Sequence, residues 1–164
     1  MKEIFERVSI RKYEDRPMEK EKIEAVLKAA MAAPSAGNQQ PWEFWVVSDR
    51  EKINALSQIS PYSGCAKGAP VVLVTCSRDA DAMFPEMIPT DLAIATENAW
   101  LEITAQGMGG VWLGTAPLED RMKQVEEILG IPECIRAYAL LPFGYPAEAR
   151  RQQDRYDESR IHWV

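Results

Sequence analysis

The sequence is poor in the residues that metal and nucleophile chemistry most often use. Its only histidine, His162, lies near the end of the 164-residue sequence, so a histidine-based metal site or a serine-histidine-acid triad would depend on the terminal segment. Its three cysteines are an odd number and include no C-x-x-C spacing. They indicate buried thiols in a reducing compartment, and argue against a disulfide framework or a redox pair.

Long hydrophobic runs and an excess of basic charge are also absent. No run approaches the roughly 18 apolar residues of a membrane span, and the first seven residues lack the apolar core of a signal peptide. We therefore expect a cytoplasmic protein with no membrane contact. The formal net charge of −6 argues against nucleic acid as a partner, because nucleic-acid binding relies on Lys and Arg to neutralise phosphates.

The charge is unevenly spread along the chain. Residues 79–133 hold eleven acidic and two basic residues, whereas residues 1–28 hold eight basic and seven acidic. A small anion would therefore bind more readily near the N-terminus than in the middle. The 46% of apolar and 27% of charged residues are otherwise typical of a globular domain that folds without disulfides or metal.

The periodicity of apolar residues alternates between helix and strand. Residues 4–8 favour a short helix, and the spacing between Pro17 and Pro34 predicts an amphipathic helix. The apolar run 70–76 predicts a central strand. Further elements are expected in chain order: strand 43–47, a helix of about ten residues from 49, a long helix capped at 90–91 and ending near 107, strand 110–113, helix 122–129 closed by Gly130, and strand 138–143.

The last 21 residues, 144–164, have no clear period. They carry four arginines and end on apolar and aromatic side chains such as Trp163. We expect this segment to lie across another surface, since Tyr156, Ile161 and Trp163 would be poorly solvated in a free tail. The chain is thus divided into a core, 1–143, and a C-terminal extension, 144–164, within one domain overall.

Two familiar catalytic motifs occur only in part. Ser35 lies in a P-S-A-G run that is faintly similar to a nucleophile elbow, but it follows a helix and lacks the first glycine. The run beginning at Gly107 starts like a dinucleotide fingerprint, yet Trp112 stands where the third glycine belongs. That run also follows a helix and opens a strand, the reverse of the required order. Neither motif supports a hydrolase or a Rossmann domain.

Three other runs could bind a small polar ligand. In the first, Arg7, Ser9 and Arg11 lie on one side of the chain if it is extended there, and two guanidinium groups with one hydroxyl suit a phosphate monoester. The alternative is a solvated surface on which the two arginines pair with nearby glutamates.

The second run enters a strand after a helix and presents Ser35, Asn38 and Gln40, whose donors and acceptors suit a neutral heterocycle. The alternative is an ordinary turn between helix and strand. The third run, 109–117, has glycines that let a flat ligand approach the backbone, and Thr115 could bond to it together with free backbone N–H groups. Its alternative is a turn at the end of a strand.

These runs together resemble the nitroreductase family of flavin mononucleotide (FMN) enzymes over essentially the whole chain. The family pattern appears in order as R-x-S-x-R at 7–11, P-S-x-x-N-x-Q-P-W at 34–42 and G-x-G-x-x-W-L-G at 107–114. It continues as G-Y-P at 144–146 and D-R-Y-D-E at 154–158. The resemblance implies an α+β fold with a central mixed or antiparallel sheet flanked by helices, and a homodimer in which the C-terminal tails are exchanged.

The resemblance also implies which residues would bind the cofactor. The phosphate would be held by Arg7, Ser9, Arg11 and Arg155, the flavin and ribityl chain by Ser35, Asn38 and Gln40, and the isoalloxazine edge by Leu113, Gly114 and Thr115. Many members carry a second arginine directly before the serine, where this chain has Val8. No side chain would be catalytic in itself, because the chemistry takes place at flavin N5.

The implied activity is reduction of nitroaromatics, quinones or similar electrophiles by NAD(P)H in a ping-pong cycle at FMN, with no metal. We expect Met83, Phe84 and Met87, within 79–89, to form the wall of the acceptor site, although packing under a helix would also explain them. Two alternatives remain open. One is a flavin-binding or flavin-handling protein without an external substrate. The other is a specialised relative such as a reductive dehalogenase, although such members tend to have longer lid insertions.

Overall fold

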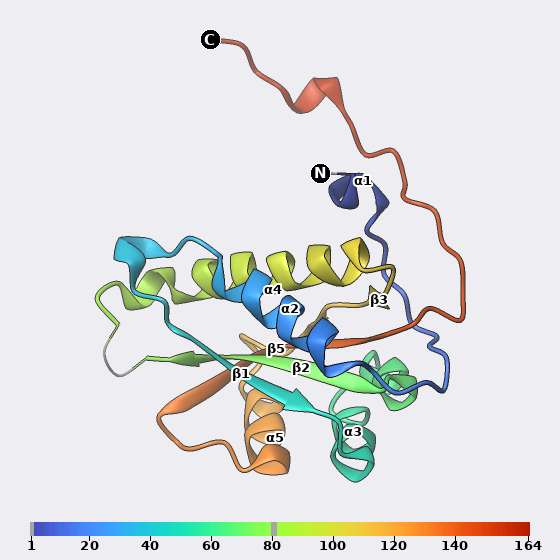
Figure 1. The fold of residues 1–164 in the computed structure, drawn as a ribbon. Helices are drawn as coiled ribbons and strands as arrows, with labels where there is room; N and C mark the ends of the chain where they lie inside the picture. Colours follow the sequence, from blue (N-terminus) through green and yellow to red (C-terminus); the bar gives the residue numbers. More distant parts are fainter. Residues whose placement is uncertain (1, 80–81) are drawn as a thin grey trace.

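An antiparallel sheet lies between two layers of helices (Figure 1). The computed structural model describes residues 2–79 and 82–164. The strand order is β1-β2-β5-β3, and β4 also pairs with β5, with every strand pair antiparallel. The strands are β1 (Trp42–Val47), β2 (Val71–Arg78), β3 (Gly109–Gly110), β4 (Leu113–Gly114) and β5 (Ile135–Gly144). The main helices are α2 (Lys20–Met31), α3 (Arg50–Leu56), α4 (Ile88–Ala105) and α5 (Glu119–Leu129).

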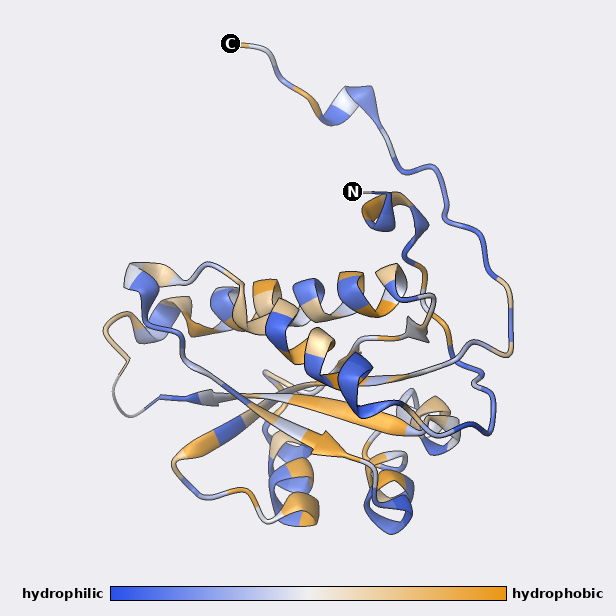
Figure 2. Ribbon diagram, viewed as in Figure 1, coloured by the Kyte–Doolittle hydropathy of each residue, from blue (hydrophilic) through white to orange (hydrophobic). Residues whose placement is uncertain are grey.

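The central strand β2 separates two hydrophobic cores because its side chains alternate between the faces of the sheet. Val71 and Leu73 belong to the core under α2 and α4, together with Trp100. Val72 and Val74 belong to the core over α3 and α5. All four strand residues are almost completely buried, which explains the uninterrupted apolar run in the sequence (Figure 2).

Several predicted elements have different bounds in the structure. The long helix α4 begins at Ile88, before the predicted cap at 90–91. Asp91 lies in its first turn and does not cap it; its carboxylate accepts the amide of Ala36 from another loop. The predicted strand 110–113 is wrong: the chain forms two separate two-residue pairs with β5. The first helix, α1 (Glu3–Glu6), is one turn, and α3 has seven residues instead of about ten. The predicted α2, β1, α5 and central strand are confirmed.

The N-terminal segment and the chain beyond β5 run side by side at one end of the sheet. Ser9 forms a parallel bridge with Gly110, and Tyr13 forms an antiparallel bridge with Pro146. Beyond this point the chain leaves the body and passes α1, with one short 3-10 turn, η4 (Glu158–Arg160) (Figure 1). Within the described residues no helix is long and apolar enough to cross a membrane.

Candidate functional site

A cluster of arginines surrounds a small polar cavity where the N-terminal segment meets the C-terminal tail. The cavity has a volume of about 170 Å³. Its charged and hydroxyl side chains come from both segments and are Arg7, Ser9, Arg150, Arg151 and Arg155. Guanidinium groups converging on one cavity beside a hydroxyl form a donor set that suits a phosphate group.

Arg7 is held in place by contacts from helix α4. Its guanidinium carbon lies 4.0 Å from the centre of the Trp100 ring, and its Nε lies 3.4 Å from Oε1 of Glu97. Only 14% of the Arg7 side chain is exposed. Burial raises the pKa of Glu97, and the nearby Arg7 charge partly opposes that shift. The arginine is therefore fixed before any ligand arrives, which reduces the entropy lost on binding.

Backbone hydrogen bonds fix the tail against the N-terminal segment. The amide of Glu14 donates to Tyr145 O, and the amide of Ala147 donates to Lys12 O, both at 2.9 Å. The Arg11 amide donates to Oε1 of Glu148 at 2.6 Å, and this bond lowers the pKa of the Glu148 carboxyl. These bonds bring the arginines of the tail beside Arg7.

Arg11 lies at a second cavity and not with Arg7 and Ser9. This cavity, of about 350 Å³, is also lined by Trp112, Leu113 and Gly114, together with Ser60, Tyr62 and Arg121. Arg11 thus lines a different cavity from the one that Arg7 and Ser9 line. Arg7 and Arg11 stand four residues apart on a largely extended segment, which corresponds to roughly 13 Å. The two cavities thus suit a ligand with a phosphate at one end and a ring at the other.

The predicted flavin-contacting stretch is partly inaccessible. Thr115 is fully buried, and its hydroxyl has no hydrogen-bond partner in residues 2–79 and 82–164. The amides of Thr115 and Ala116 are not free for a ligand, because both donate to Tyr138 O, at 3.3 and 2.8 Å. Leu113 is 9% exposed, whereas Gly114 is exposed and a Cβ added there would meet nothing within 4 Å. Gly114 is therefore the residue of this stretch that a flat ligand could approach.

The loop 35–40, which contains Ser35, Asn38 and Gln40, has an unusual backbone conformation that hydrogen bonds hold in place. Gly37, Asn38 and Gln40 have φ values of 54°, 57° and 48°, in the left-handed region that non-glycine residues seldom adopt. The Gln40 amide donates to the Ser35 hydroxyl at 3.0 Å, and the Gln40 side-chain amide donates to Asn38 Oδ1 at 3.2 Å. Strained backbone of this kind is concentrated at functional sites.

This loop lies at the opposite end of α4 from the arginine cluster (Figure 1). The Ala36 amide and the Gln39 side chain both donate to Asp91, in the first turn of α4, whereas Arg7 contacts Trp100 further along the helix. Asp91 and Trp100 are separated by about 13 Å along the axis. Within one chain, the predicted cofactor residues therefore form two separate groups: the loop 35–40 near the start of α4, and the residues of the N-terminal segment and tail near its other end.

The predicted acceptor wall belongs to the group at the loop. Phe84 lies against Gly37, where an added Cβ would be 2.7 Å from the phenyl ring, and the Gln39 side chain bonds to the Phe84 backbone in both directions. Met83, Phe84 and Met87 are 68%, 37% and 40% exposed. Such apolar exposure on three neighbouring residues fits contact with a ligand or a second chain better than packing under a helix.

Sequence reasoning missed the residues that support the arginine cluster. Arg150 and Arg151 were visible only as part of a basic tail, and nothing in the sequence indicated that they would meet Arg7. Glu97 and Trp100 stand in a helix whose period predicts burial but not a contact with the N-terminal segment.

Comparison with known proteins gives the chain a family. The model of the nitroreductase family matches residues 4–63 and 60–145. A protein of Archaeoglobus fulgidus, provisionally named NADH dehydrogenase/NAD(P)H nitroreductase, is 42% identical over 99% of this chain and 95% of its own length. This chain belongs to the nitroreductase family.

Solved structures agree with this family and its fold. A provisional NADH oxidase from Clostridium acetobutylicum is 43% identical, with a TM-score of 0.94 over 98% of this chain and 97% of that chain. An FMN-dependent nitroreductase from Clostridium difficile is 29% identical, with a TM-score of 0.91 over 98% and 96%. The predicted nitroreductase fold is therefore confirmed, with an antiparallel sheet.

Proposed function

We propose that this nitroreductase-family protein binds FMN and uses NAD(P)H to reduce small electrophiles such as nitroaromatics or quinones. The observation that carries the proposal is the pair of cavities along residues 7–11, one lined by arginines and one by Arg11, Trp112 and Gly114. The names of similar proteins, which include an NADPH-flavin oxidoreductase and an FMN reductase, support the same cofactors.

The residues present fit FMN. Arg7, Ser9 and Arg155 would hold the phosphate, and the structure adds Arg150 and Arg151 as further cations at that cavity. Arg11 would donate to the ring system beside Gly114, where the absent side chain leaves room for a flat molecule. The negative net charge of the whole chain is compatible with this pocket, because the cations are gathered at one place.

FMN supplies the redox chemistry by accepting a hydride from NAD(P)H and passing electrons to the acceptor. The chain itself binds the phosphate, orients the ring and excludes water from part of its surface. No protein side chain needs to titrate near neutral pH for these tasks. We further propose that donor and acceptor use the same flavin face in turn, in a ping-pong cycle, with Met83, Phe84 and Met87 beside it.

We also propose that the functional unit is a homodimer. The loop with Ser35, Asn38 and Gln40 lies at the opposite end of α4 from the arginine cluster of its own chain. We propose that the loop of one chain and the arginine cluster of its partner contact the same FMN. The tail, with Tyr156 and Trp163 75% and 89% exposed, leaves its own body and would lie on the partner. Ile4 and Phe5 of α1, which the tail passes, are 50% and 75% exposed and add apolar surface there. The division into a core, 1–143, and an extension, 144–164, fits this arrangement.

We also propose a cytoplasmic location, with which the three free cysteines are consistent.

The absorption spectrum of the protein tests the proposed activity. Protein that has been incubated with FMN and gel-filtered should keep a flavin spectrum, and anaerobic NADH or NADPH should bleach it. Addition of a quinone or nitroaromatic acceptor should restore the absorbance. Colourless protein would overturn the binding of FMN. A coloured protein that neither donor bleaches would instead be a flavin-binding protein without this turnover.

Mixed dimers test the sharing of the site. Arg7→Ala and Asn38→Ala chains should each bind FMN weakly as homodimers. Co-expression of the two with different affinity tags should give heterodimers with one intact site, so one tightly bound FMN per dimer is expected. The control is co-expression of two Arg7→Ala chains. Heterodimers no better than either homodimer would show that both groups act on the FMN of one chain.

A further inference from the structure

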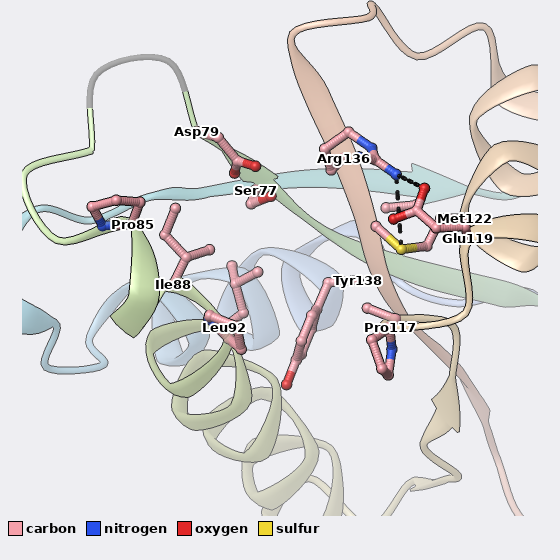
Figure 3. Close-up of a pocket in the computed structure, with 13 residues that line it drawn as sticks. Ser77, Asp79, Pro85, Ile88, Leu92, Pro117, Glu119, Met122, Arg136 and Tyr138 are labelled. Atoms are coloured by element: carbon pink, nitrogen blue, oxygen red, sulfur yellow. Dashed lines mark hydrogen bonds and ion pairs between the residues drawn. The ribbon is translucent and has the colours of Figure 1, made fainter.

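A third and larger cavity opens where β2 ends and β5 begins (Figure 3). Its volume is about 410 Å³, and it shares no lining residue with the two cavities of the candidate FMN site. Apolar side chains from α4, α5 and the turn after β4 form most of its wall; they include Ile88, Leu92, Pro117 and Met122. This volume and lining are typical of a site for a small organic molecule.

A β-bulge builds the inner wall of this cavity. Thr75 pairs with Ala139 but Cys76 pairs with Ala137, so Tyr138 is the extra residue of β5. Its backbone oxygen accepts the amides of Thr115 and Ala116, and its ring meets Trp112 edge-on at 6.0 Å. Bulges often redirect a side chain next to a functional site. Here the bulge places a fixed aromatic ring at the cavity.

Two polar side chains at the cavity have no hydrogen-bond partner among the described residues. Ser77 is only 5% exposed, yet its hydroxyl makes no hydrogen bond to any residue in the described ranges. Asp79, an exposed residue of the cavity lining, makes no side-chain hydrogen bond or ion pair in those parts of the chain. Figure 3 shows the two side chains close together at the same side of the cavity. The Ser77 hydroxyl and the exposed Asp79 carboxylate, both at the lining of the cavity, are therefore available to a ligand's polar group.

The arginine that lines this cavity, Arg136, is already paired with carboxylates. Arg136 donates to Glu119 at 2.7 Å and to Glu126 at 3.0 Å, so its charge is compensated by these two carboxylates and not by Asp79. The rim of the cavity therefore carries more negative than positive charge. A ligand with an apolar body and a cationic N–H group would satisfy Ser77 and Asp79 together.

We propose that this cavity is a second binding site, separate from the FMN site, for a small organic ammonium ion with an aromatic or aliphatic body. Its ammonium group would donate to Asp79 and Ser77. Its body would lie against Tyr138, Leu92 and Ile88, where it would be removed from water. The site does not depend on flavin, so its test can succeed or fail independently of the proposed reductase activity.

Calorimetric titration of the full-length protein with three matched compounds tests this site. 2-Phenylethylammonium should bind saturably with one molecule per chain. 2-Phenylethanol, which has the same ring and linker without the charge, should bind about tenfold more weakly, and 3-phenylpropionate should not bind. The flavin spectrum of FMN-loaded protein should not change during the titration. No saturable binding, equal binding of all three compounds, or displacement of FMN would overturn the proposal.

Point variants connect that binding to this cavity. Asp79→Asn should weaken 2-phenylethylammonium binding about tenfold, and Ser77→Ala should weaken it by a smaller factor. Asp120→Asn is the matched control, because Asp120 is an exposed residue of α5 that does not line the cavity and its replacement changes the net charge equally. Thermal unfolding should confirm that all three variants fold. Equal affinity of Asp79→Asn and Asp120→Asn would place the ligand elsewhere.

Discussion

The guanidinium of Arg7 lies over the ring of Trp100, with 4.0 Å between its carbon and the ring centre. Trp100 is only 7% exposed, and its indole N–H has no partner among the described residues. The ring face therefore supports a cation that also contacts Glu97 and lines the arginine cavity. This contact connects the core under α4 with the candidate phosphate site.

Loss of that ring should weaken FMN binding. Trp100→Leu removes a cation–π contact worth about 1–2 kcal/mol at a partly buried position, so the dissociation constant should rise roughly 5- to 30-fold. Titration with quenching of FMN fluorescence measures this change. Trp100→Phe keeps a ring and should recover most of the affinity. If the Leu and Phe variants bind FMN equally, Trp100 serves only the hydrophobic core.

A side chain at position 109 should displace the R-x-S-x-R segment, residues 7–11. A Cβ there would lie 2.6 Å from Ile10 Cγ1 and 2.7 Å from Ile10 Cβ, and Ile10 is 5% exposed. Gly109→Ala should therefore lower the free energy of unfolding by about 1–3 kcal/mol and shift the neighbouring Ser9 and Arg11. Denaturant unfolding measures the loss. The control is Gly64→Ala, where nothing lies within 4 Å, and a similar loss there would contradict this explanation.

The sequence allowed prediction of the elements whose signals are local. Helix α2 follows from apolar spacing that ends before Pro34, and β2 follows from a run that is apolar on both faces. The start of α4 could not be predicted in the same way. Asp91 is a good helix cap by type, but here its carboxylate bonds to Ala36 and Gln39, a contact that depends on tertiary structure. The strands β3 and β4 are too short to show a period.

The arrangement of the candidate site likewise depends on tertiary packing and could not be predicted from local sequence signals. The motifs identified Arg7, Ser9 and Arg11 as cofactor residues, but their division between two cavities depends on where the segment lies between β3 and the chain after β5. The distance between Ser35 and the arginine cluster also follows only from the packing of both against α4. Likewise, the third cavity arises from a bulge at Tyr138 that no local pattern in β5 indicates.

The Glu97 carboxyl should make stability depend on pH. Burial raises its pKa in the folded protein above the ordinary 4.5, so the folded state binds more protons than the unfolded state between the two values. Stability of the natural protein should therefore fall, relative to Glu97→Gln, as pH rises through the range just above 4.5. Above the folded pKa the difference should stay constant. Urea unfolding of both proteins at several pH values measures it, and a difference that shrinks with rising pH would contradict this sign.

Replacement of Asp91 should loosen the loop 35–40. This carboxylate is 2% exposed and accepts the Ala36 amide at 3.0 Å and the Gln39 side chain at 2.7 Å. Asp91→Ala leaves both donors without their partner, and should cost about 2–3 kcal/mol of stability. Hydrogen exchange at the Ala36 amide should become faster, and FMN affinity should fall although the arginine cluster is intact.

Mixed dimers test whether the loop that Asp91 holds contributes to the FMN site of the partner chain or whether Asp91→Ala only destabilises its own chain. If the loop acts on the FMN of the partner, an Asp91→Ala chain paired with an Arg7→Ala chain should retain one tight FMN site, because the second site combines two natural surfaces. A chain carrying both substitutions, paired with the natural chain, should instead have two damaged sites, one through each change. Equal FMN binding by these two heterodimers would show that the loop and the arginine cluster do not serve sites shared between chains.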